Sequence, residues 1–96
     1  MSILLEQMKE KELIALNFER VDVSAEDSGH KAFHYYTYDF GNGSFSLISN
    51  SSDEVKAGKW YVEVFEDESI RFTNSSDVMG IIDVISRNTI KTDDNN

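Results

Sequence analysis

Residues 32–49 read AFHYYTYDFGNGSFSLIS, and this stretch decides the fold of the chain. Ala32–Phe40 is rich in aromatic side chains, which are typical of strands, and Ser44–Ser49 alternates apolar with polar residues. Gly41-Asn42-Gly43 lies between them and supplies residues that adopt positive φ in tight hairpin turns. The stretch therefore predicts two antiparallel strands joined by a short turn.

Further elements are predicted on both sides of this hairpin. Two polar segments, 24–31 and 50–58, read as loops, and Glu66-Asp67-Glu68 reads as a turn. The predicted strands outside the hairpin are Phe18–Val23, Lys59–Phe65 and Ser69–Thr73. The predicted helices span residues 3–16, with Ser2 as N-cap, and 75–88, where Val78, Ile81, Ile82 and Ile85 have helical spacing.

Strands grouped between two helices indicate the α+β class. We expect an antiparallel meander sheet of four to five strands, with the N-terminal and C-terminal helices packed on one face. Residues 1–88 should form a single domain. Residues 89–96 have no apolar periodicity, so they are expected to form a flexible tail.

Aromatic residues occupy both faces of the predicted strands. We expect one set to pack under the helices, consisting of Phe33, Tyr35, Phe45, Trp60 and Phe72. The alternation then leaves the other set on the opposite face, consisting of Tyr36, Tyr38, Phe40, Tyr61 and Phe65. Large exposed apolar patches are uncommon on monomers, so this second face is a candidate contact surface.

The composition excludes several classes of protein. The 96 residues carry 18 acidic and 9 basic side chains, a formal net charge of −9, which repels nucleic-acid phosphates. Disulfides and thiolate metal sites are excluded because the chain has no cysteine. No signal peptide or membrane span is recognisable, so we expect a cytoplasmic protein with no membrane partner.

Catalytic and metal-binding motifs are absent from the sequence. The two histidines, His30 and His34, lie in a predicted loop and a predicted strand, with no nucleophile spaced for a triad. If both lay on one strand they would be about 13 Å apart, too far for one zinc ion. We therefore expect a non-enzymatic protein without cofactor or metal.

Acidic residues flank several of the aromatic residues. Aromatic side chains can anchor a partner, and carboxylates can steer a basic partner toward them. The predicted partner-binding residues are Tyr36, Tyr38, Tyr61, Glu63, Phe65, Glu66, Asp67 and Glu68.

Three functional hypotheses follow from these features. The first is an inhibitor that occupies the basic, nucleic-acid-binding site of another protein, as a phage-encoded anti-defence protein would; such a protein would not bind nucleic acid itself. A toxin-neutralising immunity protein is the alternative within the same class. A small ligand-binding or enzymatic domain, with a pocket between sheet and helices near His34, is the alternative from another class. Homodimerisation through the exposed sheet face also remains open.

Overall fold

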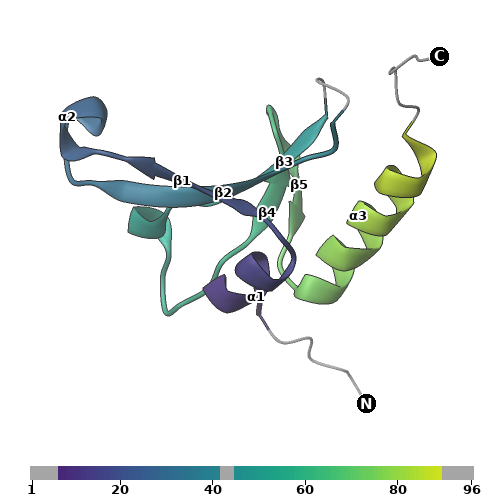
Figure 1. Ribbon diagram of the computed structural model, residues 1–96. Coiled ribbons are helices and arrows are strands. Elements are labelled where there is room, and N and C mark those ends of the chain that lie inside the picture. The colour runs from purple at the N-terminus through teal and green to yellow at the C-terminus, as the bar shows by residue number, and fades with distance from the viewer. Residues whose placement is uncertain (1–6, 42–44, 90–96) are drawn as a thin grey trace.

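The computed structural model describes residues 7–41 and 45–89 of the chain. Within these residues, five strands form one antiparallel sheet in the order β1-β2-β3-β4-β5, which confirms the predicted meander and the α+β class (Figure 1). The helices α1 and α3 lie on the same face of this sheet. The elements are α1 (Glu10–Ala15), β1 (Glu19–Val23), α2 (Ala25–Ser28), β2 (Phe33–Asp39), β3 (Ser46–Ser49), the 3₁₀ turn η1 (Ser52–Glu54), β4 (Val62–Val64), β5 (Asp67–Phe72) and α3 (Ser75–Asn88).

The strand register defines two faces of the sheet, because residues directly opposite each other point to the same side. On the helix-covered face, Tyr38 pairs with Leu47, and Leu47 pairs with Val64. On the other face, which we call the open face, Thr37 pairs with Ile48 and Glu63 pairs with Arg71. The open face is where the candidate site is found.

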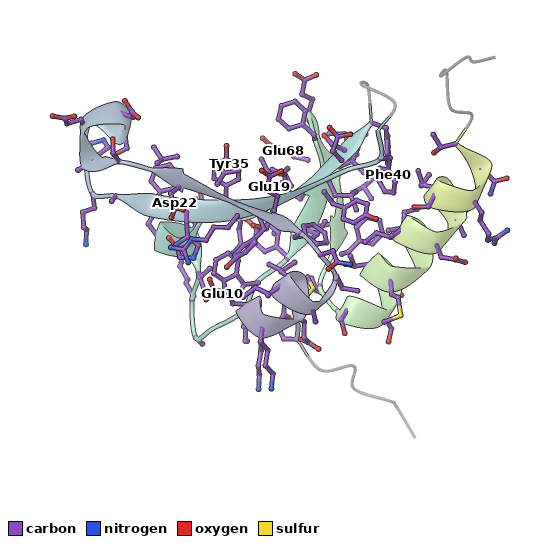
Figure 2. All side chains as sticks on the ribbon, in the orientation of Figure 1. Glu10, Glu19, Asp22, Tyr35, Phe40 and Glu68 are labelled. Carbon is purple, nitrogen blue, oxygen red and sulfur yellow. The ribbon has the colours of Figure 1, made fainter. Side chains whose placement is uncertain are left out.

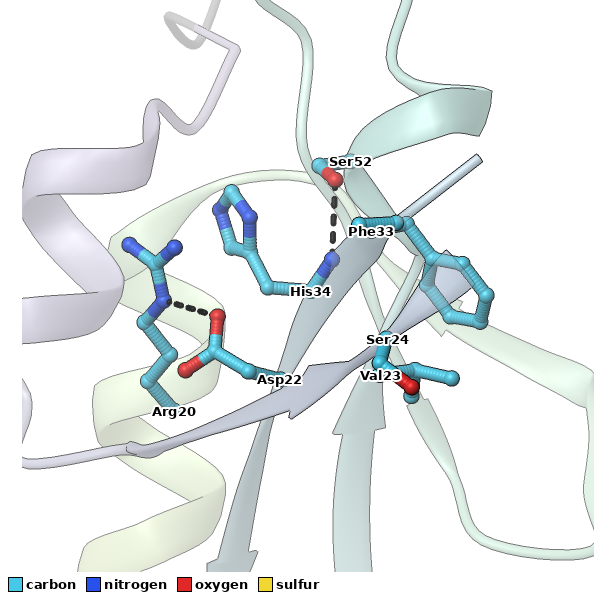
Figure 3. A pocket seen from close by; sticks show the side chains of 8 residues that line it. Arg20, Asp22, Val23, Ser24, Phe33, His34 and Ser52 are labelled. Carbon is cyan, nitrogen blue, oxygen red and sulfur yellow. Dashed lines mark hydrogen bonds and ion pairs between the residues drawn. The ribbon is translucent and has the colours of Figure 1, made fainter. Parts of the chain in front are cut away.

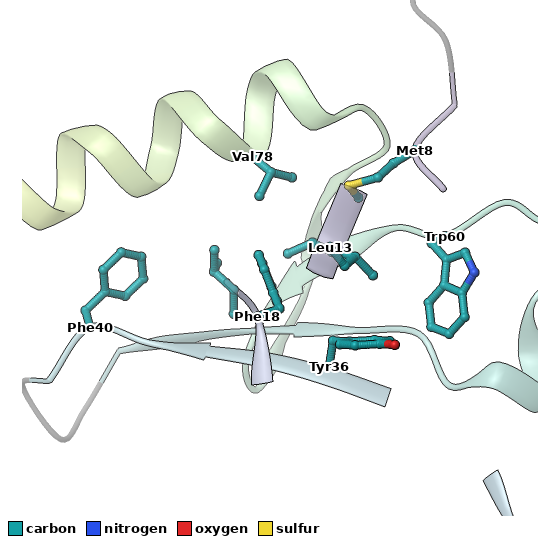
Figure 4. Packing of buried hydrophobic residues seen from close by; sticks show 9 residues of the cluster. Met8, Leu13, Phe18, Tyr36, Phe40, Trp60 and Val78 are labelled. Atoms are coloured by element: carbon teal, nitrogen blue, oxygen red, sulfur yellow. The ribbon is translucent and has the colours of Figure 1, made fainter. Parts of the chain in front are cut away.

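The core lies between the covered sheet face and the helices α1 and α3 (Figure 4). Leu47 and Val62 from the central strands are fully buried, as are Leu13 from α1 and Val78 from α3. The expected helical stripe is confirmed in part, since Ile81, Ile82 and Ile85 pack against the core but are only half-buried. The other buried apolar residues are Met8, Phe18, Tyr36, Phe40 and Trp60.

The expected orientation of β2 is wrong. Tyr36 and Phe40 are buried and Tyr38 packs against the core, so these residues belong to the covered face. Phe33 and Tyr35 alternate with them and lie on the open face, half-buried. Aromatic residues occupy both sides of this strand, so alternation alone cannot select the buried side. Pairing with Leu47 and a hydrogen bond from Tyr36 to α1 select it instead.

The first helix begins later than predicted. Residues 7–9 are not helical, because Met8 N donates to Thr73 O at 2.9 Å and Trp60 N donates to Met8 O at 3.0 Å. These bonds hold the segment between the start of β4 and the end of β5. Lys9 is the N-cap residue, and its backbone N–H donates to Glu12 Oε1. Residues 3–6 and the predicted cap at Ser2 lie outside the described residues.

Several boundaries in the second half of the chain also differ from the prediction. The expected 24–31 loop contains the single-turn helix α2, which Ser24 caps and Gly29 ends at φ 77°. The β4–β5 turn lies at Phe65 and Glu66, where Glu66 has φ 69°, and β5 already begins at Asp67. Asn74 caps α3, with its Oδ1 accepting from Asp77 N at 2.9 Å.

Two predicted segments lie wholly or partly outside the described residues. Most of the predicted tail, residues 90–96, and part of the predicted 41–43 turn lie outside the described residues. Among the helices in the part of the chain that the structure describes, none has the length and apolar character needed to cross a membrane.

Candidate protein-binding site

A concavity of about 390 Å³ lies on the open face, and we call it the β4–β5 concavity. Its floor includes Ile48 from β3 and Glu63 from β4, and Tyr61 and Phe65 lie at the two ends of β4. Figure 2 shows Glu68, Glu19 and Tyr35 on this side of the sheet, away from Glu10 on α1. The other lining residues used below are Glu54, Glu66, Glu68 and Arg71.

A guanidinium group is bound inside this concavity by two of the chain's own side chains. Arg71 Cζ lies 3.9 Å from the centroid of the Tyr61 ring, within the range of a cation–π interaction. Arg71 Nε and Nη2 donate to Glu63 Oε2 at 3.0 and 2.8 Å. These contacts form because Glu63 and Arg71 are direct neighbours in the β4–β5 register. Hydrogen bonding to Glu63 raises the pKa of Arg71, although desolvation opposes it.

Carboxylates from separate segments line the same concavity as this cation. Glu54 comes from η1, where its Oε1 accepts from Ser51 Oγ at 2.9 Å. Glu66 belongs to the tight β4–β5 turn, and Glu68 to β5. All three side chains line the concavity and belong to exposed residues, so their charges are available to a partner. The concavity thus combines aromatic area with excess negative charge.

The structure brings together five of the eight predicted partner-binding residues in this concavity, namely Tyr61, Glu63, Phe65, Glu66 and Glu68. Tyr36 and Tyr38 are on the covered face, so their expected exposure is wrong. Asp67 does not line the concavity. Its carboxylate accepts hydrogen bonds from the Ser69 hydroxyl and backbone N–H, which lower the pKa of Asp67.

Two charged lining residues, Arg71 and Glu54, were missed by the sequence analysis. Counting from the turn at Phe65 and Glu66 would place Glu68 opposite Glu63, and Arg71 takes this position only because the β4–β5 register shifts between Glu63 and Val64. Glu54 carries no sequence signal either, since it comes from a polar segment whose path depends on tertiary contacts. One of these contacts is the hydrogen bond from His34 N to Ser52 Oγ, which joins η1 to β2.

A second cluster of polar side chains lies on the covered side, between α1 and β2. His34 Nε2 is 2.7 Å from Glu10 Oε2, and Tyr36 Oη donates to the same oxygen at 2.8 Å. An ionised carboxylate only accepts hydrogen bonds, so Nε2 carries the proton in this pair. The His34 ring also lies against Trp60, with centroids 5.7 Å apart.

The ionisation of Glu10 and Tyr36 reflects these contacts. Burial by itself would raise the pKa of Glu10, but hydrogen bonds from His34 and Tyr36 and the nearby charge of Arg20 hold it below its ordinary value. Burial and the adjacent Glu10 carboxylate raise the pKa of Tyr36, so its hydroxyl is held as a neutral donor. The cluster therefore links α1 to the sheet most strongly when Glu10 is ionised.

The His34 cluster borders a second concavity of about 380 Å³ (Figure 3). Arg20 and Asp22 from β1 line one side, where Arg20 Nε donates to Asp22 Oδ1 at 2.9 Å. Ser52 lies on another side, and its Oγ accepts from the His34 backbone N–H at 3.0 Å. That bond is to the His34 main chain, so the geometry does not form a serine–histidine nucleophile pair.

Replacing Glu10 with glutamine should make the free energy of unfolding depend less on pH in the acidic range. The folded-state pKa of Glu10 is lowered, so its contribution is present above the unfolded pKa and is lost as pH falls through the folded value, below about pH 4.5. The Glu10 side chain is 38% exposed, so solvent screening limits the effect to at most about 1 kcal/mol. Urea unfolding at a series of pH values measures it.

The control for this measurement is Glu26→Gln, which removes an exposed carboxylate from α2 that forms no hydrogen bond or ion pair with His34 or Tyr36. This variant should follow the wild-type pH dependence. If the free energy of unfolding falls equally with decreasing pH in Glu10→Gln and Glu26→Gln, the contacts to Glu10 do not stabilise the fold.

Neither concavity is arranged as a metal centre. In the described segments 7–41 and 45–89, no group of three histidine, aspartate or glutamate side chains is placed to hold a metal ion. No known protein family, curated protein sequence or solved structure matches the chain.

Proposed function

We propose that the chain is a non-catalytic binding module whose β4–β5 concavity holds a basic surface of another protein. The observation that carries this proposal is the convergence of Tyr61 and Phe65 with carboxylates from η1, β4, the β4–β5 turn and β5 around one concavity. The net charge of −9 extends the negative field well beyond these residues. Acids at the rim accelerate association, and aromatic side chains at the centre slow dissociation.

Within this class, an antagonist that occupies a nucleic-acid-binding site is the function we favour. A protein with twice as many acidic as basic side chains presents the charge that such a site already binds. A phage-encoded anti-defence protein is one example, and a toxin-neutralising immunity protein would use the same chemistry. The two differ in whether binding displaces nucleic acid from the partner.

Homodimerisation through the open face is less favoured. The apolar part of this face, with Val21, Phe33, Tyr35 and Ile48, would supply contact area. Two copies would, however, bring together surfaces that each carry Glu63, Glu66 and Glu68, and like charges facing each other destabilise association.

An NMR titration tests the location of binding. We expect an arginine- and glycine-containing peptide to shift the backbone amide signals of residues 61–71, with smaller shifts at high ionic strength. The acidic helix α2, with Glu26 and Asp27, serves as an internal control because it lies at the far end of the sheet. Equal shifts in both regions would mean that the peptide responds only to total charge, and would contradict the proposed site.

The His34 cluster favours a second candidate function, a small ligand-binding or enzymatic domain. Its support is the 2.7 Å His34–Glu10 contact beside the second concavity. A screen of small metabolites by NMR distinguishes the two functions. Ligands that shift Asp22, His34 and Ser52 but leave residues 61–71 unchanged would favour the second candidate.

A further inference from the structure

The Arg71 contacts in the β4–β5 concavity join a mostly buried carboxylate to a half-exposed cation. The Glu63 side chain is 16% exposed, whereas that of Arg71 is 51% exposed. Arginine has a long flexible stem, so the half-exposed guanidinium can move away, and the mostly buried Glu63 carboxylate that it leaves without a partner then favours another cation in its place. Glu63 and the Tyr61 ring therefore form a site that persists when Arg71 moves away.

The geometry of this site suits a guanidinium better than an ammonium group. The guanidinium places two N–H donors on one carboxylate oxygen while its plane lies near the Tyr61 ring. A lysine ammonium is a compact point charge that cannot reproduce this combination of stacking and forked donation. The other Glu63 oxygen, Oε1, has no hydrogen-bond partner among the residues that the structure describes, so it can accept from an incoming group.

The surrounding charges favour replacement of Arg71 by a cation from outside. Arg71 is the one cationic residue among the described residues lining the concavity, which also contains Glu54, Glu66 and Glu68. These carboxylates exceed what a single guanidinium neutralises. An arriving arginine therefore meets a negative field even before Arg71 leaves.

We infer that the β4–β5 concavity binds an arginine side chain of the partner in the place that Arg71 fills in the free chain, so that Arg71 acts as an internal competitor. This inference rests on the proposed function and adds the residue type that is recognised. It predicts that removing Arg71 strengthens binding, whereas loss of an ordinary contact residue would weaken it.

The test compares Arg71→Gln with Arg87→Gln, which has the same charge change. Arg87 pairs with Asp83 at 3.2 Å on α3 and does not line the concavity. A labelled arginine- and glycine-containing peptide should bind Arg71→Gln about three- to tenfold more tightly than Arg87→Gln, by fluorescence anisotropy. For a lysine-containing peptide of equal length, the affinity of Arg71→Gln should exceed that of Arg87→Gln by less than about twofold.

Arg71→Lys provides a second variant that keeps the charge and removes the planar fork. It should bind the arginine peptide more tightly than wild type, because lysine competes less well for Tyr61 and Glu63. Thermal unfolding checks that each variant is folded. Affinity of Arg71→Gln equal to or below that of Arg87→Gln would overturn the inference.

Failure of the inference and failure of the proposed function give different results. If lysine substitutions at Glu66 and Glu68 weaken peptide binding but Arg71→Gln brings no gain, the surface is correct and the internal competition is wrong. If substitutions in the concavity and on α2 have equal effects on peptide binding, the proposed surface itself is wrong.

Discussion

Replacing Leu47 with alanine should lower the free energy of unfolding by about 2–5 kcal/mol. Leu47 is fully buried in β3, between Tyr38 on β2 and Val64 on β4. Truncation removes apolar contacts on both sides and leaves a cavity that neighbouring strands cannot close without losing their pairing. Urea denaturation measures the loss, and Trp60 reports it because this single tryptophan is itself buried.

Ile14→Ala is the matched control for Leu47→Ala. Ile14 lies on α1 with 57% of its surface exposed, and alanine is a good helix former, so its effect should stay within about 0.5 kcal/mol. Equal losses in the two variants would mean that the β2–β3–β4 register is wrong. A shift of one residue would place Ile48 in the core instead of Leu47.

The second large effect is expected when Glu66 and Glu68 are both replaced by lysine. The association rate with an arginine-containing peptide should fall at least about tenfold at low ionic strength, because the concavity loses its steering charge. The salt dependence of the rate should decrease as well, while the fold is retained, since both residues are exposed. Stopped-flow fluorescence measures the rate.

The control replaces Glu26 and Asp27 on α2 with lysine, which gives the same change in net charge far from the concavity. This control should reduce the rate only modestly, through the overall charge of the protein. A reduction as large as that of the Glu66 and Glu68 variant would show that association depends on net charge alone. The acidic residues at the β4–β5 turn would then serve solubility.

The order of most elements could be predicted from the sequence, because the signals are local. Strands alternate with a period of two, and α3 has both an apolar stripe from Val78 to Ile85 and a cap at Asn74. The meander follows from short connections between successive strands. Local patterns also placed Tyr61, Glu63 and Phe65 on one face, because alternate residues of a strand point the same way.

The tertiary structure decided which aromatic face of β2 is buried and which charges meet in the candidate site. Both faces of Phe33–Phe40 are aromatic, so burial of Tyr36 depends on partners distant in sequence, namely Glu10 and Trp60. The same kind of contact displaced the start of α1, through the backbone bonds of Met8 to Thr73 and Trp60. The site likewise depends on the β4–β5 register, which places Arg71 beside Glu63, and on η1, which brings in Glu54. Periodicity determines which residues of a strand point to the same side. Only the pairing between strands determines which of the two sides faces the helices.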